Sequence, residues 1–294
     1  MIKKRKIFIF LILTFILLLT GCGKNKKDED VNKKAIQELD YLDTKIVSIL
    51  NKLNNITLRN YTLNEDQIQK EENSSNSTSK DNKDDNTNEQ KESDSQSSNS
   101  SKTEETNITV TSMEPKSVLT INKDDIDWNE IKSEIETINE AWSIVLLDLS
   151  YLNVDNNDIL SFSSALNDTL ISVKDENKIN TLTNCSKLYS FIPKFEKQLK
   201  DNQDIQDIKQ VKAYLLNAYS NVEQNNWVDI EKNIASADDI FKKITGNSEY
   251  MKNKEYKANK TYVLLKELQN SLKYKNKDIF YLKYKNLIES INML

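Results

Sequence analysis

Glycine is scarce in this chain, and the scarcity limits its possible folds more than any other feature. Only three of the 294 residues are glycine, and two of them, Gly21 and Gly23, border an N-terminal apolar run. Gly246 is therefore the single glycine of the remaining body. Phosphate-binding loops, dinucleotide-binding turns and sheets rich in tight hairpins need more backbone freedom than one glycine supplies. We expect none of these folds here.

Apolar residues recur at spacings of three and four through the C-terminal part of the chain, which is the period of an amphipathic helix. Asp127, with Glu130 three residues later, resembles a capping box and predicts a helix start. Pro193 should end or restart a helix, and Gly246 should cap one. The stripes predict seven helices, over residues 128–152, 156–173, 179–192, 208–222, 227–244, 248–274 and 280–294. Because the connections are short, neighbouring helices should run antiparallel. The predicted fold class is all-α, an antiparallel helical bundle or array.

A further helical stripe lies near the N-terminus and consists of Ala35, Leu39, Leu42, Ile46, Ile49, Leu53 and Ile56. One helix cannot bury such a face alone, so it must dock on the C-terminal domain or pair with a second copy. No apolar residue occurs from Gln69 to Asn107, and such a stretch is expected to be disordered. We predict an N-terminal tether and helix within 22–64, a disordered linker at 65–117 and an all-helical domain at 118–294. Short apolar runs at 56–58, 61–63 and 108–111 predict a small ribbon beside the linker.

The first twenty-two residues resemble the signal peptide of a bacterial lipoprotein. Basic residues at 3–6 precede an apolar run that ends in Leu19-Thr20-Gly21-Cys22. The run is too short to span a bilayer core of about 30 Å comfortably, and a short apolar core behind a basic start is typical of a secretory signal. The resemblance to the lipobox implies cleavage after residue 21, a diacylglyceryl group on the sulfur of Cys22 and an acyl group on its new amino terminus. It implies a chain anchored on the extracytoplasmic face of the cell membrane. The alternative is an uncleaved signal anchor.

The chain has no histidine, and so it lacks the usual general base, the Ser-His and Cys-His pairs and the commonest metal ligand. Cys185 falls on an apolar stripe, where a thiol behaves as a small hydrophobic residue. The residues from Asp125 to Glu136 have the spacing of a calcium loop, but Glu130 replaces the glycine of its turn and the helical stripe continues through it. We predict no catalytic residue, no metal and no cofactor. An enzyme that uses carboxylates alone is the remaining catalytic alternative.

Positive charge gathers near the C-terminus of an otherwise acidic chain. Residues 242–285 carry twelve lysines and four acidic residues, while the whole chain has a net charge of −5. Six of the twelve tyrosines lie in the same segment. The plain interpretation is a solvated helical hairpin with half-buried tyrosines. The functional interpretation is a surface for anionic envelope polymers, lipid headgroups or an acidic protein, and not for nucleic acid. Its candidate residues are Lys252, Lys254, Lys257, Lys260, Lys273, Lys275 and Lys277.

These observations predict a membrane-anchored, non-enzymatic lipoprotein that binds or scaffolds a component of the cell envelope. The alternative is an accessory or receptor lipoprotein of a transport system. The usual two-lobed α/β receptor is disfavoured by the scarcity of glycine and the absence of parallel-strand patterns. Helical receptors that hold a metal through imidazole are excluded because the chain has no histidine.

Overall fold

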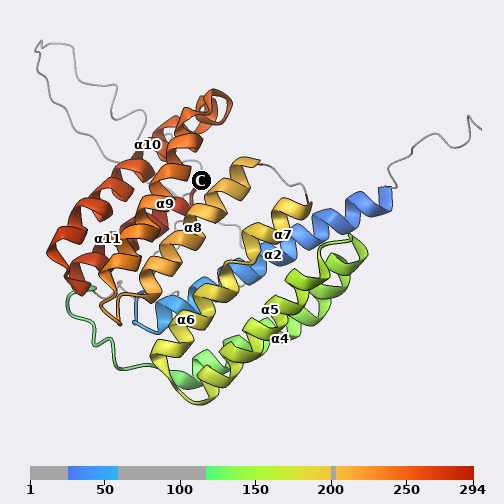
Figure 1. Cartoon of the computed structure of the whole chain (residues 1–294), viewed down its shortest axis with the longest axis horizontal. Coiled ribbons are helices and arrows are strands. Elements are labelled where there is room, and N and C mark those ends of the chain that lie inside the picture. The colour runs from blue at the N-terminus through green and yellow to red at the C-terminus, as the bar shows by residue number, and fades with distance from the viewer. Residues whose placement is uncertain (1–25, 59–116, 200–202) are drawn as a thin grey trace, which may run out of the picture. The chain divides into compact units, whose positions relative to one another are not determined.

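The computed structural model describes residues 26–58, 117–199 and 203–294, and the regular secondary structure of these ranges is helix alone, with no strand (Figure 1). The all-α prediction is confirmed. The elements are α2 (Lys26–Lys52), α4 (Trp128–Tyr151), α5 (Asn156–Lys174), α6 (Lys178–Tyr189), α7 (Ile192–Leu199), α8 (Gln203–Ser220), α9 (Trp227–Gly246), α10 (Ser248–Ser271), the short 3₁₀ helix η1 (Leu272–Tyr274) and α11 (Lys277–Ile291). No described helix is both long enough and apolar enough to cross a bilayer.

The first ring of four helices consists of α2, α4, α5 and α6, each packed on the next, with α6 closing back on α2. The polar contacts along α2 and α4 give their direction. Lys34 near the start of α2 pairs with Asp148 near the end of α4 at 2.8 Å, and Lys52 pairs with Glu130 at 2.6 Å. These two helices are therefore antiparallel, as are α4, α5 and α6 across their short turns.

The second ring consists of α8, α9, α10 and α11, and α11 closes it by packing on α8. Contacts between α10 and α11 show that these helices are antiparallel: Thr261 Oγ1 lies 2.6 Å from Ser290 Oγ, and Lys283 pairs with Glu267 at 2.7 Å. The two rings meet where α8 packs on α6 and on α7, and α7 also packs on α2. The described part of the chain is thus two four-helix rings that share one interface.

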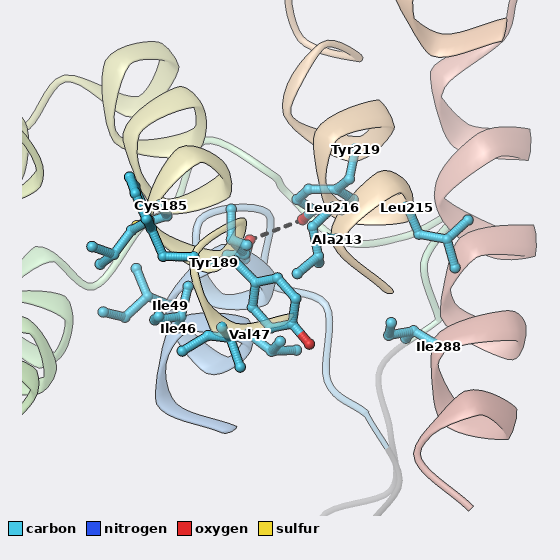
Figure 2. Packing of buried hydrophobic residues seen from close by; sticks show 14 of the residues in the cluster. Ile46, Val47, Ile49, Cys185, Tyr189, Ala213, Leu215, Leu216, Tyr219 and Ile288 are labelled. Atoms are coloured by element: carbon cyan, nitrogen blue, oxygen red, sulfur yellow. Dashed lines mark hydrogen bonds between the residues drawn. The ribbon is translucent and has the colours of Figure 1, made fainter. Parts of the chain in front are cut away.

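Helix α2 docks on the C-terminal helices, which decides between the two possibilities left by its sequence. Its predicted stripe is fully buried from Ala35 to Leu53, and Ile56 is 4% exposed. Figure 2 shows Ile46 and Ile49 of α2 beside Cys185 and Tyr189 of α6, with Tyr219 of α8 nearby. The hydroxyl of Tyr219 donates to the carbonyl oxygen of Leu50 at 3.0 Å. A helix from before the predicted linker therefore completes the core formed by the helices that follow it.

The predicted helix starts at Asp127 and Trp227 are confirmed, but residues 128–294 form eight described α-helices where seven were predicted, because a separate helix, α7, follows α6. The carboxylate of Asp127 accepts a hydrogen bond from the Glu130 amide at 3.0 Å, as a capping residue does. Pro193 is the second residue of α7 and so restarts a helix. The predicted long helix over 248–274 ends at Ser271 and continues as η1.

Two local predictions are wrong. Gly246 is the last residue of α9 and has no left-handed backbone, and the adjoining Asn247 caps both α9 and α10. An asparagine can end one helix with its backbone and begin the next with its side chain, which glycine cannot do. The apolar stripe over 179–192 predicts a buried Ile179 at its start, but this side chain is 45% exposed because it lies in the first turn of α6, beyond the edge of the core.

Several predictions fall outside the described residues. They are the signal peptide at 1–21, the lipidation site Cys22, the linker at 65–117 up to its last residue, and the ribbon pieces at 61–63 and 108–111. The third ribbon piece, at 56–58, is described and has no regular secondary structure.

Candidate anionic-partner surface

The seven candidate lysines lie on the α10–α11 hairpin, where the structure divides them into two groups. Lys252, Lys254, Lys257 and Lys260 lie on the first half of α10, and Lys273, Lys275 and Lys277 lie at the turn into α11. Thirteen residues of nearly continuous helix separate Lys260 from Lys273, which corresponds to about 20 Å. One compact anion could contact either group but not both, whereas an extended polymer could contact both.

The α10 group centres on an exposed tyrosine. Tyr256 is 74% exposed, and Lys252 and Lys260, one turn before and one turn after it, are both exposed. Lys257 is partly buried, and none of these three lysines forms an ion pair with a described residue. Their ammonium groups are therefore available to an anion.

Lys254 differs from the rest of its group. Its ammonium donates to the backbone carbonyl of Leu294, and it lies 5.3 Å from the ring centre of Tyr250. Burial, with a smaller contribution from Asp204, raises the pKa of Tyr250 to about 12. Lys254 thus holds the C-terminal end of α11 against α10, and its first role is structural.

The turn group contains one strained residue. Lys275 ends η1 with φ 46°, a left-handed conformation that costs an L-residue free energy relative to glycine. Lys273 and Lys275 are exposed, and Lys273 lies 5.0 Å from the ring centre of the exposed Tyr274. The turn therefore projects two lysines and an aromatic ring into solvent.

Lys277 was a candidate for binding an anionic partner, but its ammonium group is already engaged by Glu223. It donates to the carbonyl oxygen of Glu223 at 3.1 Å and pairs with its carboxylate at 3.2 Å. The same carboxylate accepts from Tyr281 at 2.6 Å and lies 3.8 Å from Lys178. Burial opposes ionisation of this group, but Tyr281, Lys178 and Lys277 together lower the pKa of Glu223. Lys277 therefore fixes the start of α11 to the loop between α8 and α9.

The tyrosines of the segment do not share one environment. Tyr250 and Tyr262 are half-buried, as predicted, and Tyr256 and Tyr274 are exposed. Tyr281 and Tyr284 are fully buried and contact Tyr219 of α8, with ring centres 5.4 and 4.5 Å away. The clustering of tyrosines in the sequence therefore reflects core packing of α11 as well as surface composition.

The other residues considered for chemistry are structural. Cys185 is fully buried, and burial raises the pKa of its thiol to about 12. Trp142 packs against Phe162 with ring centres 3.9 Å apart, and Trp128 and Trp227 pack at the edge of the core. No group of three or more possible metal ligands occurs within the described ranges. An open groove between α2 and α4 contains a single carboxylate, that of Glu38, which pairs with Lys34 at 3.2 Å.

The sequence reasoning missed a buried set of charges between α2 and α8. Lys212 pairs with Asp43 at 2.6 Å, and both side chains are at most one tenth exposed. One turn away, Lys209 is also buried and pairs with the fully buried Glu196 of α7 and with Asp40, whose side chain is 56% exposed. The sequence signal for these pairs is a matched spacing: Asp40 and Asp43 are three residues apart on α2, and their partners Lys209 and Lys212 are three residues apart on α8. It could be recognised only once the two helices were known to be parallel neighbours.

A second missed feature is an uncharged surface on α4 and α5. Residues 141–147 and 159–167 contain no charged side chain, although 30% of the whole chain is charged. The large apolar residues exposed on this helix pair are Ile144 (52%), Leu147 (65%), Tyr151 (49%), Leu160 (68%) and Ile171 (59%).

No protein-family model, no curated protein and no solved structure matches the chain.

Proposed function

We propose that the chain is a lipid-anchored, extracytoplasmic binding module without catalytic activity, and that its second ring presents lysines to an anionic partner. The observation that carries the proposal is a set of three lysines around Tyr256, the exposed Lys252 and Lys260 and the partly buried Lys257. None of them forms an ion pair with a described residue. The lipobox-like residues before Cys22 support the anchor.

The arrangement of the rings supports a division between anchoring and binding. The anchor precedes α2, which belongs to the first ring, whereas the free lysines lie on α10 of the second ring (Figure 1). α10 packs on α9 and α11, and α2 packs on α4, α6 and α7. A partner bound to α10 would therefore leave the helices of the anchored ring uncovered.

The chemistry of the α10 group favours a phosphate-bearing polymer. Lysine is a compact, fully charged donor that binds phosphate oxygens without demanding a planar partner. Exposed Tyr256 supplies an apolar surface between two charges, on which the carbon backbone of a polymer can rest. Repeated weak contacts along one chain increase the overall affinity, which suits a site whose charges lie along a helix.

The test compares the full-length protein with the double variant Lys252→Glu/Lys260→Glu. The matched control is Lys197→Glu/Lys232→Glu, which reverses two exposed lysines on α7 and α9 that form no ion pair with a described residue. Binding to a poly(glycerol phosphate) chain, and separately to vesicles containing phosphatidylglycerol, is measured at low and high salt. The first variant should lose polymer binding and the control should keep it.

Salt supplies an independent criterion. The Debye length falls from about 10 Å at 0.1 M to about 3 Å at 1 M, so binding through these lysines should weaken strongly over that range. Equal binding by the wild type and the α10 variant, or binding that is indifferent to salt, would contradict the proposed partner. Unchanged melting of both variants confirms that the comparison reports binding and not folding.

A further inference from the structure

The uncharged apolar face of α4 and α5 calls for an explanation that core packing does not give. Ile144, Leu147 and Tyr151 follow each other at spacings of three and four on the outer side of α4, and Leu160 lies on the outer side of α5. All four are about half exposed or more, while Trp142, Val145 and Phe162 fill the interior of the same helix pair. Contiguous exposed apolar residues of this kind mark a surface that contacts a partner or a membrane.

This face lies beside the start of α2. The hydroxyl of Tyr151 donates to the carboxylate of Asp28 at 2.9 Å, and Asp148, one turn earlier on α4, pairs with Lys34 at 2.8 Å. Because α5 runs back from the end of α4 after a short turn, Leu160 lies at the same end of the ring. The apolar face therefore occupies the end of the ring from which the chain leads back to Cys22.

Covalent geometry places this end close to the lipid anchor. Lys26, the first residue of α2, is four positions after Cys22, and Asp28 is two positions further. At 3.3–3.6 Å for an extended residue and 1.5 Å for a helical one, Cys22 lies within about 17 Å of Asp28. Tyr151 touches Asp28, so the apolar face cannot be far from the surface in which the acyl chains of Cys22 are inserted.

We propose that the outer face of α4 and α5, formed by Ile144, Leu147, Tyr151 and Leu160, lies against the lipid interface next to the anchor. The inference rests on the proposed lipidation of Cys22. The occupant is the bilayer surface and not a second copy, because the anchor holds this face beside the bilayer at all times and so makes the contact intramolecular in effect. The chemistry agrees, since the face combines aliphatic side chains with one tyrosine and is bordered by uncharged serines such as Ser143, Ser150 and Ser161.

Two of the neighbouring carboxylates are already engaged, while the exposed Glu140, one turn before Ile144, borders the face. Asp148 is neutralised by Lys34, and Asp28 is engaged by the hydroxyl of Tyr151. In this orientation the first ring contacts lipid, and the α10 lysines belong to the other ring, where a soluble anionic polymer can reach them.

The experiment places a reporter on the face of the acylated, full-length protein. Leu147→Cys and Leu160→Cys are each labelled with an environment-sensitive fluorophore, and the protein is reconstituted into vesicles that contain a lipid-bound quencher. Val263→Cys on α10 is the matched control, because Val263 is 58% exposed and Leu147 is 65% exposed. Cys185 is fully buried and should not compete for the label in the folded protein.

The fluorophores at 147 and 160 should shift to shorter wavelength and lose most of their emission to the lipid quencher, while the fluorophore at 263 keeps its emission. Equal responses at 147 and 263 would overturn the inference, as would cross-linking of Leu147→Cys to a second copy in place of quenching. Flotation with the vesicles and the mass of the acyl groups test the anchor separately. A protein that floats and is acylated but is not quenched at 147 or 160 refutes this inference alone, whereas a protein that is never acylated refutes the proposed function and this inference with it.

Discussion

Loss of the buried lysine at position 212 should weaken the docking of α2 more than any surface change. Lys212 and Asp43 are both nearly inaccessible, their charged atoms are 2.6 Å apart, and Tyr189 donates to the second carboxylate oxygen at 3.1 Å. Lys212→Met keeps most of the aliphatic stem but leaves Asp43 as a buried carboxylate with one neutral donor. Breaking a buried pair in this way costs about 3–5 kcal/mol.

The expected change is large enough for ordinary unfolding experiments. In a unit of this size each kcal/mol shifts the melting temperature by roughly 2–4 °C, so Lys212→Met should lower it by about 6–20 °C. Urea unfolding is followed by circular dichroism and by tryptophan fluorescence. The fluorescence sums Trp128 and Trp142 of the first ring and Trp227 of the second, so transitions by the two methods that do not coincide would show that unfolding is not two-state.

A companion variant separates the unpaired charge from lost packing. Asp43→Leu/Tyr189→Phe/Lys212→Met removes every polar member of this contact at once, and replacing a buried pair by apolar residues of similar volume is often neutral or stabilising. We expect the triple variant to regain most of the stability lost by Lys212→Met. Lys232→Met, at an exposed lysine of α9, is the control and should change the unfolding free energy by less than about 0.5 kcal/mol. A loss below about 1 kcal/mol for Lys212→Met would refute the buried ion pair between Lys212 and Asp43.

Four further outcomes are expected. Because the pKa of Glu223 is lowered in the folded protein, its charge adds stability above the unfolded pKa of about 4.3, and this stability is lost as the pH falls through the folded pKa. Glu223→Gln should therefore make the unfolding free energy less dependent on pH below about pH 5. An unchanged pH dependence would contradict the ion pairs of Glu223. Lys275→Gly should stabilise the protein by about 0.5–1 kcal/mol in urea, because glycine adopts the left-handed conformation without strain, and destabilisation would argue against that turn. Cys185 should react with a thiol reagent at pH 8 only after urea is added, and rapid reaction of the folded protein would show that α6 is not closely packed. Deletion of residues 69–107 should leave the unfolding free energy within about 1–2 kcal/mol of the full chain, and a loss above about 3 kcal/mol would mean that this segment contributes to the fold.

The helices could be predicted because their burial depends on local spacing. The stripe of α4 and its cap at Asp127 follow from residues at most four positions apart, and the structure has them at the predicted places. The apolar stripe of α2 likewise predicted a buried face, because a helix with a continuous apolar face must pack against another part of the structure. What covers it depends on helices more than seventy residues away, and no spacing within α2 contains that information.

The features that could not be predicted depend on tertiary neighbours. Lysine is normally exposed, and the burial of Lys209 and Lys212 follows from acids 169 residues distant in the sequence. The candidate lysines formed one group in sequence, but the length of α10 separates them, and Lys277 pairs with Glu223, which lies in the loop between α8 and α9. The apolar face of α4 and α5 had a signal in its two charge-free runs, yet only the packing shows which of those side chains remain outside.

The most direct test of the account is the mass of the mature N-terminus. Full-length protein is extracted from the membrane fraction of a host that processes bacterial lipoproteins, digested, and its N-terminal peptide is measured by mass spectrometry. The account predicts a peptide that begins at Cys22 and carries a diacylglyceryl group, and it predicts that Cys22→Ala abolishes both the lipid and the cleavage after residue 21. A peptide that still contains residues 1–21, or an unmodified Cys22 in membrane-extracted protein, would contradict the lipid anchor on which the proposed function and the lipid-facing surface depend.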